Sequence, residues 1–145
     1  HCFCRSWWWA DASRAVSVCK GLNENRDIRI LYSDEDKMSM DGHKFFQPHF
    51  KPDYNPDLLC TVNYICHLFV VDREIISQVG MLRKEFDGAQ DYDFIFRCVE
   101  TVKPEQIYHI PRILYHWRCM RIPQQRIRKQ DLCFWGRKTG YWRAL

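Results

Sequence analysis

Short β-prone runs alternate with helical segments through the middle of the chain, and this alternation limits the fold more than any other feature of the sequence. Strands are expected at residues 28–32, 63–71 and 106–117, with helices at 72–79 and 91–102. Asp72 is a suitable N-cap for the first of these helices, and Gly80 follows its end. Strands separated by helices are typical of layered α/β domains, so we predict an α/β fold with one mixed sheet.

Turn and loop signals divide this middle zone further. Residues 16–22 are expected to form the end of a helix that stops near Gly21 and Asn23. The pair Asp41-Gly42 predicts a hairpin turn. Residues 47–56 are expected to form a loop, because each proline in this stretch lacks a backbone donor.

The two ends of the chain differ in composition and in hydrophobic periodicity from residues 16–118. Residues 1–15 contain three consecutive tryptophans and no readable period, and residues 119–145 are polar and basic. This tail carries seven Lys or Arg against one acid, whereas the whole 145-residue chain has a net charge of +4. The basic character therefore belongs to the tail alone and does not indicate an acidic partner for the α/β zone.

Nothing in the sequence indicates export or a membrane span. No run approaches the roughly 20 apolar residues that a span requires, and the first residues lack the layout of a signal peptide, so the cytosol is the expected compartment. The eight cysteines form no CxxC pair, which argues against a disulfide framework or a zinc site. Cys60, Cys66 and Cys98 lie in apolar sequence and are expected to be reduced, structural thiols.

The first chemical candidate is an acidic segment, Ser33-Asp34-Glu35-Asp36, at the end of the predicted strand 28–32. Ligands of open α/β sheets bind outside the carboxyl ends of strands, where Asp34 and Asp36 could hold a cation or sugar hydroxyls. A solvated acidic turn is the alternative interpretation.

The second candidate is the start of the predicted helix 91–102. Gln90 or Asp91 could cap this helix, and Asp93 could pair with Arg97 one turn later. A carboxylate at this place has its charged form stabilised by the helix dipole, which suits a general base that accepts a hydroxyl proton. Both interpretations remain open from these residues alone.

Aromatic and basic residues close the last predicted strand. Trp117 and Arg118 could stack on a sugar or bind a phosphate, or they could be a core aromatic and a solvated cation. His67, inside the predicted strand 63–71, is more often a satisfied core histidine than a ligand in such a position.

Five further segments follow the acidic strand end in a specific order. They are FKPD (50–53), NYICHLFVV (63–71), VG (79–80), GAQDYD (88–93) and HIPRILYHWR (109–118). This order resembles bacterial family 2 glycosyltransferases of the cell-wall and surface-polysaccharide type, from about residue 16 to residue 118. The resemblance implies a partial GT-A, Rossmann-like domain in which Asp91 deprotonates the acceptor hydroxyl.

The candidate residues are expected to share one cleft at the carboxyl edge of the sheet. The expected cleft residues are Asp34, Asp36, His67, Gln90, Asp91 and Asp93, with Trp117 and Arg118 as further substrate-binding residues. The resemblance implies a nucleotide-sugar donor, a saccharide or lipid-linked acceptor, and usually Mg²⁺ or Mn²⁺ on the donor diphosphate. It also implies a cytoplasmic enzyme, peripheral to the inner membrane face, that binds no nucleic acid.

Both atypical ends lack metal-binding residues of the family pattern. An Asp-x-Asp motif is expected where residues 5–9 stand, and a His at the position of Met120. Codons for residues 5–9 can be read one nucleotide later as Asp-His-Asp-Asp, and residues 134–143 can be reread as an amphipathic helix. We therefore interpret both ends as translated out of frame, with divergent ends as the alternative, and expect no turnover from these residues alone.

Two other classes of function compete with this interpretation. The basic, Trp-dotted tail is compatible with salt-sensitive binding of single-stranded nucleic acid. The chain could also be a non-catalytic interaction fragment. The tail carries no known recognition motif, so the glycosyltransferase interpretation leads.

Overall fold

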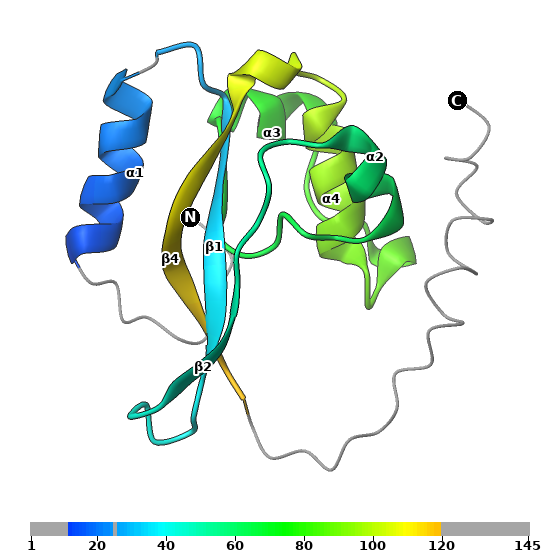
Figure 1. Cartoon of the computed structure of the whole chain (residues 1–145). Helices are drawn as coiled ribbons and strands as arrows, with labels where there is room; N and C mark the ends of the chain where they lie inside the picture. Colours follow the sequence, from blue (N-terminus) through cyan, green and yellow to red (C-terminus); the bar gives the residue numbers. More distant parts are fainter. Residues whose placement is uncertain (1–11, 25, 120–145) are drawn as a thin grey trace.

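A mixed sheet lies between one helix and a group of three in the computed structural model, which describes residues 12–24 and 26–119 (Figure 1). The single helix is α1 (Ala12–Glu24), and the group consists of α2 (Pro56–Thr61), α3 (Arg73–Val79) and α4 (Gln90–Val99). Two short 3₁₀ turns, η1 (Lys84–Phe86) and η2 (Pro104–Gln106), precede α4 and the last strand. The predicted α/β class with a mixed sheet is confirmed.

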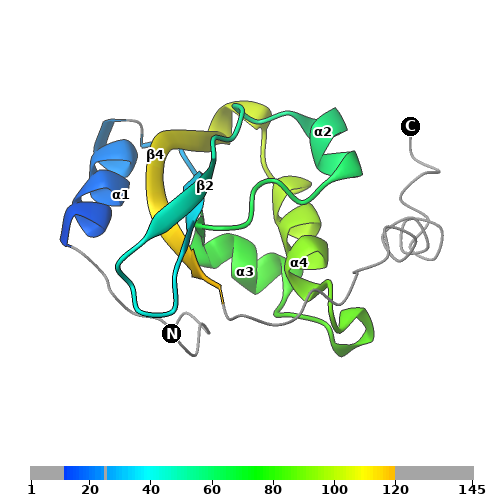
Figure 2. The same cartoon turned by 60° about the horizontal axis from the view of Figure 1, so that its bottom comes forward.

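Strand β1 (Ile30–Met38) is the centre of the sheet. Strand β4 (Ile107–Arg118) runs parallel to it along its whole length. The other edge of β1 is shared by two antiparallel partners, β3 (Phe69–Val71) opposite its first residues and β2 (Phe45–His49) opposite its last. In Figure 2, β2 is the strand of the sheet nearest the viewer, with α1 on one side of the sheet and α3 and α4 on the other. On one edge, β4 therefore pairs with both halves of β1, whereas on the other edge each half has its own partner.

Side chains of β1 alternate between two apolar layers, as the period of a strand requires. Ile30 and Tyr32 belong to the core under α2, α3 and α4, whereas Leu31 belongs to the smaller core on the α1 side. Helix α1 approaches the sheet closely at Gly21, where a Cβ would lie 3.3 Å from the Tyr108 ring and 3.4 Å from Leu31. The first half of β1 is thus buried on both faces.

Several local predictions agree with the structure. The Asp72 carboxylate accepts a hydrogen bond from the Glu74 amide and caps α3, which ends at Gly80 with φ of 78°. Gly42, with φ of 77°, lies in the predicted turn between β1 and β2. Helix α1 passes through Gly21 and ends at Glu24, one residue after the predicted stop at Asn23. The close approach to the sheet explains why a glycine is suited to this helical position.

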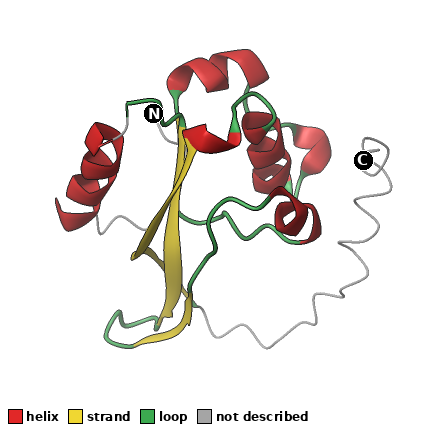
Figure 3. Ribbon diagram, turned by 45° about the horizontal axis from the view of Figure 1, so that its top comes forward, coloured by secondary structure: helices red, strands yellow, loops and turns green. Residues whose placement is uncertain are grey.

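The predicted strand 63–71 is largely wrong, because only Phe69–Val71 pairs with β1. The preceding backbone satisfies its polar groups with side chains instead of a ladder. Lys51 donates to the carbonyls of Ile65 and His67, and the His67 amide donates to Glu35. Figure 3 shows loop segments that pass between the strands and the group of helices. Residues 62–68 are therefore a loop that the charged side chains of Lys51 and Glu35 hold in place.

The predicted loop 47–56 is also corrected in part. Its first residues belong to β2, an edge strand whose free side tolerates Pro48. Its last residue, Pro56, opens helix α2, where a missing amide costs nothing, and the Asn55 side chain accepts from the Leu58 amide as N-cap.

The interpretation of the ends as out of frame concerns mainly residues 1–11 and 120–145, which lie outside the described residues. Among the residues that the structure describes, no helix is long and apolar enough to cross a membrane.

Candidate functional site

A pocket of about 550 Å³ lies where Glu35, Asp36 and Lys37 of β1 meet the end of β4 and the first turn of α4. Four of the predicted site residues line it: Asp36, His67, Asp91 and Trp117. Residues from β2 and from the loop 62–68 complete the wall. Sequence segments that are far apart along the chain therefore form one site.

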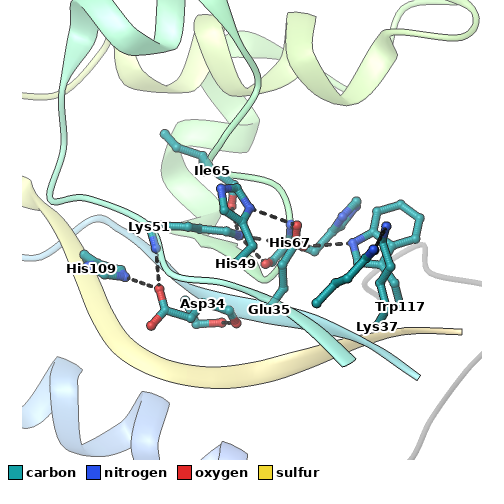
Figure 4. Close-up of polar contacts among 11 residues, drawn as sticks. Asp34, Glu35, Lys37, His49, Lys51, Ile65, His67, His109 and Trp117 are labelled. Atoms are coloured by element: carbon teal, nitrogen blue, oxygen red, sulfur yellow. Dashed lines mark hydrogen bonds and ion pairs between the residues drawn. The ribbon is translucent and has the colours of Figure 1, made fainter. Parts of the chain in front are cut away.

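Glu35 is the polar centre of this pocket, although it was not among the predicted binding residues (Figure 4). Its Oε2 atom accepts hydrogen bonds from the His67 amide and from the Trp117 indole, both at 2.8 Å. His49 Nδ1 lies 3.4 Å from Oε1, and Lys51 Nζ lies 3.8 Å from Oε2. Glu35 thus joins β1 to the loop, to β2 and to β4, and its carboxylate shapes the site.

The buried Lys51 ammonium ties the loop to the sheet. It donates to the carbonyls of Ile65, at 3.1 Å, and of His67. Burial lowers the pKa of Lys51 to about 8, although the Glu35 carboxylate opposes this shift. Lys51 is therefore protonated at neutral pH and remains a hydrogen-bond donor there.

The imidazole of His67 is fixed between two aromatic rings. It stacks on Tyr115 with centroids 4.9 Å apart and meets Trp117 edge-on at 4.9 Å. Burial lowers the pKa of His67, although Glu35 and Asp91 favour the charged form. Its Nδ1 atom is buried and has no hydrogen-bond partner among the described residues. The ring is thus neutral, oriented and left with an unpartnered nitrogen, unlike the satisfied core histidine that such positions usually hold.

Asp91 lies in the first turn of α4 and is oriented by an uncharged donor. Asn63 Nδ2 lies 3.3 Å from its Oδ2 atom, and the Cys66 thiol lies within 4.8 Å of the carboxylate. Burial and then the negative charge of Asp91 raise the pKa of the Cys66 thiol, so this thiol keeps its proton. A carboxylate held in this way can accept a proton from a hydroxyl in the pocket.

The other acidic candidates have structural partners outside the pocket lining. The buried Asp34 carboxylate accepts from the Lys51 amide and lies 2.8 Å from His109 Nε2, as Figure 4 shows. Asp93 is fully buried and binds both Arg83 and Arg97. Burial alone would raise the pKa of Asp93, but the hydrogen bonds from the two arginines hold it below its usual range. The pairing of Asp93 with Arg97, one of two interpretations of the sequence, is present.

The remaining candidates lie at the rim or in local turns. Gln90 accepts from the Gly88 amide directly before α4, which is a local role at the helix start. Arg118 ends β4 opposite Met38 and is not among the lining residues. Asp36 contacts His116 Nδ1 within the pocket wall.

Sequence reasoning missed Glu35, Lys51, Asn63 and Cys66. Glu35 and Lys51 lie in segments that were singled out, but the sequence does not show that their charges meet in space. The apolar sequence around Cys66 predicts a structural thiol, whereas Cys66 lies in the pocket beside Asp91. The adjacent Cys66-His67 pair was the available signal, since both residue types bind metals.

One group of potential metal ligands converges in the described part of the chain. A ligand atom from each of Cys66, His67 and Asp91 lies within 4.8 Å of the other two. Mg²⁺ and Mn²⁺ prefer oxygen ligands, so a group with a thiol and an imidazole does not fit the expected cation. Of the neighbouring carboxylates, Asp36 is engaged by His116, and Glu35 by His67 and Trp117.

The geometry defines an α/β domain with a polar pocket at one end of a mixed sheet. No protein-family model matches the chain. It is similar to the uncharacterized protein y4gI of Sinorhizobium fredii, with 45% identity over 108 residues, which is 74% of this chain. It is also similar to the O-antigen biosynthesis protein RfbC of Myxococcus xanthus, with 47% identity over 92 residues, or 63% of this chain. The chain spans 12% of the length of the first relative and 7% of the second.

Proposed function

We propose that this chain supplies the acceptor side of a sugar-transferring domain in polysaccharide biosynthesis. The name of the Myxococcus relative supports the pathway, and the resemblance of the pocket segments to family 2 glycosyltransferases supports the reaction. The observation that carries the proposal is the placement of Asp91, whose carboxylate lines the pocket, is oriented by Asn63 and lies beside Cys66.

In the proposed reaction, the acceptor hydroxyl approaches Asp91 in the pocket. The carboxylate takes the hydroxyl proton as the oxygen bonds to the anomeric carbon of a nucleotide-sugar, and the nucleoside diphosphate leaves with its bonding electrons. Trp117, with 43% of its surface exposed, offers an aromatic face to a sugar ring. Asn63 positions the base without neutralising it, because its amide is an uncharged donor.

No step of this reaction is assigned to a divalent cation on the described residues. The group formed by Cys66, His67 and Asp91 does not suit Mg²⁺ or Mn²⁺. We propose that a cation on the donor diphosphate is held by other residues of the complete enzyme. The acceptor is proposed to be a saccharide or a lipid-linked saccharide at the cytoplasmic membrane face.

A chimeric enzyme tests the proposal. The matched segment of the Myxococcus relative is replaced by the corresponding segment of this chain, and O-antigen is measured in a strain that lacks the relative. We expect the chimera to restore O-antigen and its Asp91→Asn variant to fail. Asp57→Asn is the matched control, because Asp57 is the second residue of α2 as Asp91 is of α4 but lies outside the pocket lining.

A chimera that accumulates as folded protein but restores no O-antigen would contradict the proposal. Equal restoration by Asp91→Asn and Asp57→Asn would show that the pocket carboxylate is not the base. The nucleic-acid alternative is not favoured, since it depends on the basic tail and no feature of the described pocket supports it.

A further inference from the structure

Cys66, His67 and Asp91 combine three ligand types that Zn²⁺ binds. Their ligand atoms lie within 4.8 Å of one another. Ligands of a tetrahedral zinc ion are roughly 3.3–3.8 Å apart, so a small contraction suffices to close the group around an ion. Thiolate and imidazole ligands select zinc over Mg²⁺ or Ca²⁺.

Two buried polar atoms beside this group support an ionic ligand. His67 Nδ1 and Asn63 Oδ1 have no hydrogen-bond partner among the described residues, and both residues line the pocket. Buried polar atoms almost always have a partner, and exceptions cluster where an ion or another group binds. Asn63 also donates to Asp91 through its Nδ2 atom, and a ring nitrogen of His67 lies within 4.8 Å of the same carboxylate, so both exceptions belong to residues beside Asp91.

The ligands are held in place before any metal binds. The His67 amide is bound by Glu35 and its carbonyl by Lys51, while Tyr115 fixes the plane of the ring. Asp91 is fixed by the first turn of α4 and by Asn63. Outer partners of this kind orient metal ligands and strengthen binding.

We propose that Cys66, His67 and Asp91 form a zinc site that controls the pocket. Binding forms a bond between zinc and the Cys66 sulfur, and the thiol proton passes to solvent. Three protein ligands leave one position for water or an acceptor hydroxyl. The bound ion occupies the carboxylate of Asp91, so zinc inhibits sugar transfer; this consequence rests on the proposed function, whereas the site itself does not.

Cobalt titration of the full chain under reducing conditions tests the site. Co²⁺ replaces zinc and gives a near-ultraviolet charge-transfer band when a thiolate binds it. We expect one equivalent of this band, displaced by Zn²⁺, to be absent in Cys66→Ser and present in Cys60→Ser. His67→Gln and Asp91→Asn should weaken cobalt binding by more than ~10-fold, since even outer partners contribute that much. Equal bands in wild type and Cys66→Ser, or no band in wild type, would overturn the site.

A measurement on the unaltered chain guards against misfolded variants. Alkylation of each cysteine by iodoacetamide is followed by peptide mass spectrometry with and without Zn²⁺. Zinc should slow the alkylation of Cys66 at least ~10-fold and leave Cys60 unchanged. Equal rates at Cys66 with and without zinc would refute the site.

The failure of this inference is separable from the failure of the proposed function. A cobalt band that depends on Cys66, in a chain whose chimera transfers no sugar, would retain the zinc site and remove the transfer proposal. A transferring chimera without the band would do the opposite.

Discussion

The two halves of β1 differ in almost every property although they share one strand. Ile30, Leu31 and Tyr32 are fully buried between β3 and β4 and pack on both layers of helices. The second half, from Asp34 to Met38, is largely charged and pairs with β2, and its residues Glu35, Asp36 and Lys37 line the pocket. The apolar half anchors the strand in the hydrophobic core, and the charged half extends from it and contributes side chains to the pocket.

The same division recurs within the first turn of α4. Asp93 is fully buried and neutralised by Arg83 and Arg97, whereas Asp91, two residues earlier, lines the pocket with only uncharged donors beside it. One carboxylate supports the fold and the other is available for chemistry. The stability of variants in the core and in the pocket tests these differences.

The largest expected effect on stability is at Asp93. Asp93→Ala leaves two arginines without their buried partner and should lower the free energy of unfolding by about 3–5 kcal/mol. Asp91→Asn should change it by less than about 0.5 kcal/mol, because no buried charge loses its partner. Urea denaturation of both variants checks this, and equal losses would break the distinction between the two carboxylates.

The next effect concerns pH and Lys51. Because the folded-state pKa is about 8 and the ordinary value is 10.5, the folded chain binds fewer protons than the unfolded chain between these pH values. Stability from this group therefore rises with pH through that window, by up to about 3 kcal/mol. Lys51→Met should lack this rise.

The difference between wild type and Lys51→Met isolates the group. Burial raises the pKa of Cys98 and Tyr92 to about 12, so these groups oppose the rise in both proteins. Parallel stability curves from pH 7 to pH 10.5 would contradict the burial of a charged Lys51.

A smaller effect is expected in the apolar half of β1. Ile30→Val removes one buried methylene group and should cost about 1 kcal/mol. Lys37→Gln, in the pocket half, should cost less than about 0.5 kcal/mol because its side chain is exposed. Thermal denaturation of the two variants measures the difference in stability. A larger loss of stability from Lys37→Gln than from Ile30→Val would contradict the assignment of the first half of β1 to the core and the second half to the pocket.

A small effect, below that of Ile30→Val, is expected at Trp117. Trp117→Phe removes the indole donor to Glu35 but keeps an aromatic ring beside His67, so the loss should be about 0.5 kcal/mol. Near-ultraviolet circular dichroism and urea denaturation follow it. A loss as large as that of Asp93→Ala would show that the pocket is itself part of the core.

The sequence predicts the strands and caps around the apolar core well, but it predicts the pocket residues only in part. The strand that contains Ile30 and Tyr32, the cap at Asp72 and the strand over 107–118 follow from local composition and turn chemistry. The role of Glu35 does not follow, because the pairing of β1 with β4 is irregular between Ser33 and Glu35. Such irregularities re-aim side chains, so simple alternation fails there.

Long-range charge pairing explains the remaining differences. Residues 63–68 have the composition of a strand, but their polar backbone groups bind Lys51 and Glu35, which are distant in sequence. The meeting of Cys66, His67 and Asp91 likewise depends on the packing of a loop against α4. No local pattern encodes either contact.

The central claim is that the Asp91 carboxylate accepts the proton of an acceptor hydroxyl during sugar transfer. The most direct test is the transfer rate of the purified chimera and its Asp91→Asn variant, with nucleotide-sugar binding measured by calorimetry in parallel. We predict that the rate falls by ~10²–10⁴-fold with unchanged donor binding, as expected for the loss of a general base. A variant that transfers sugar at the rate of the parent chimera would contradict the account.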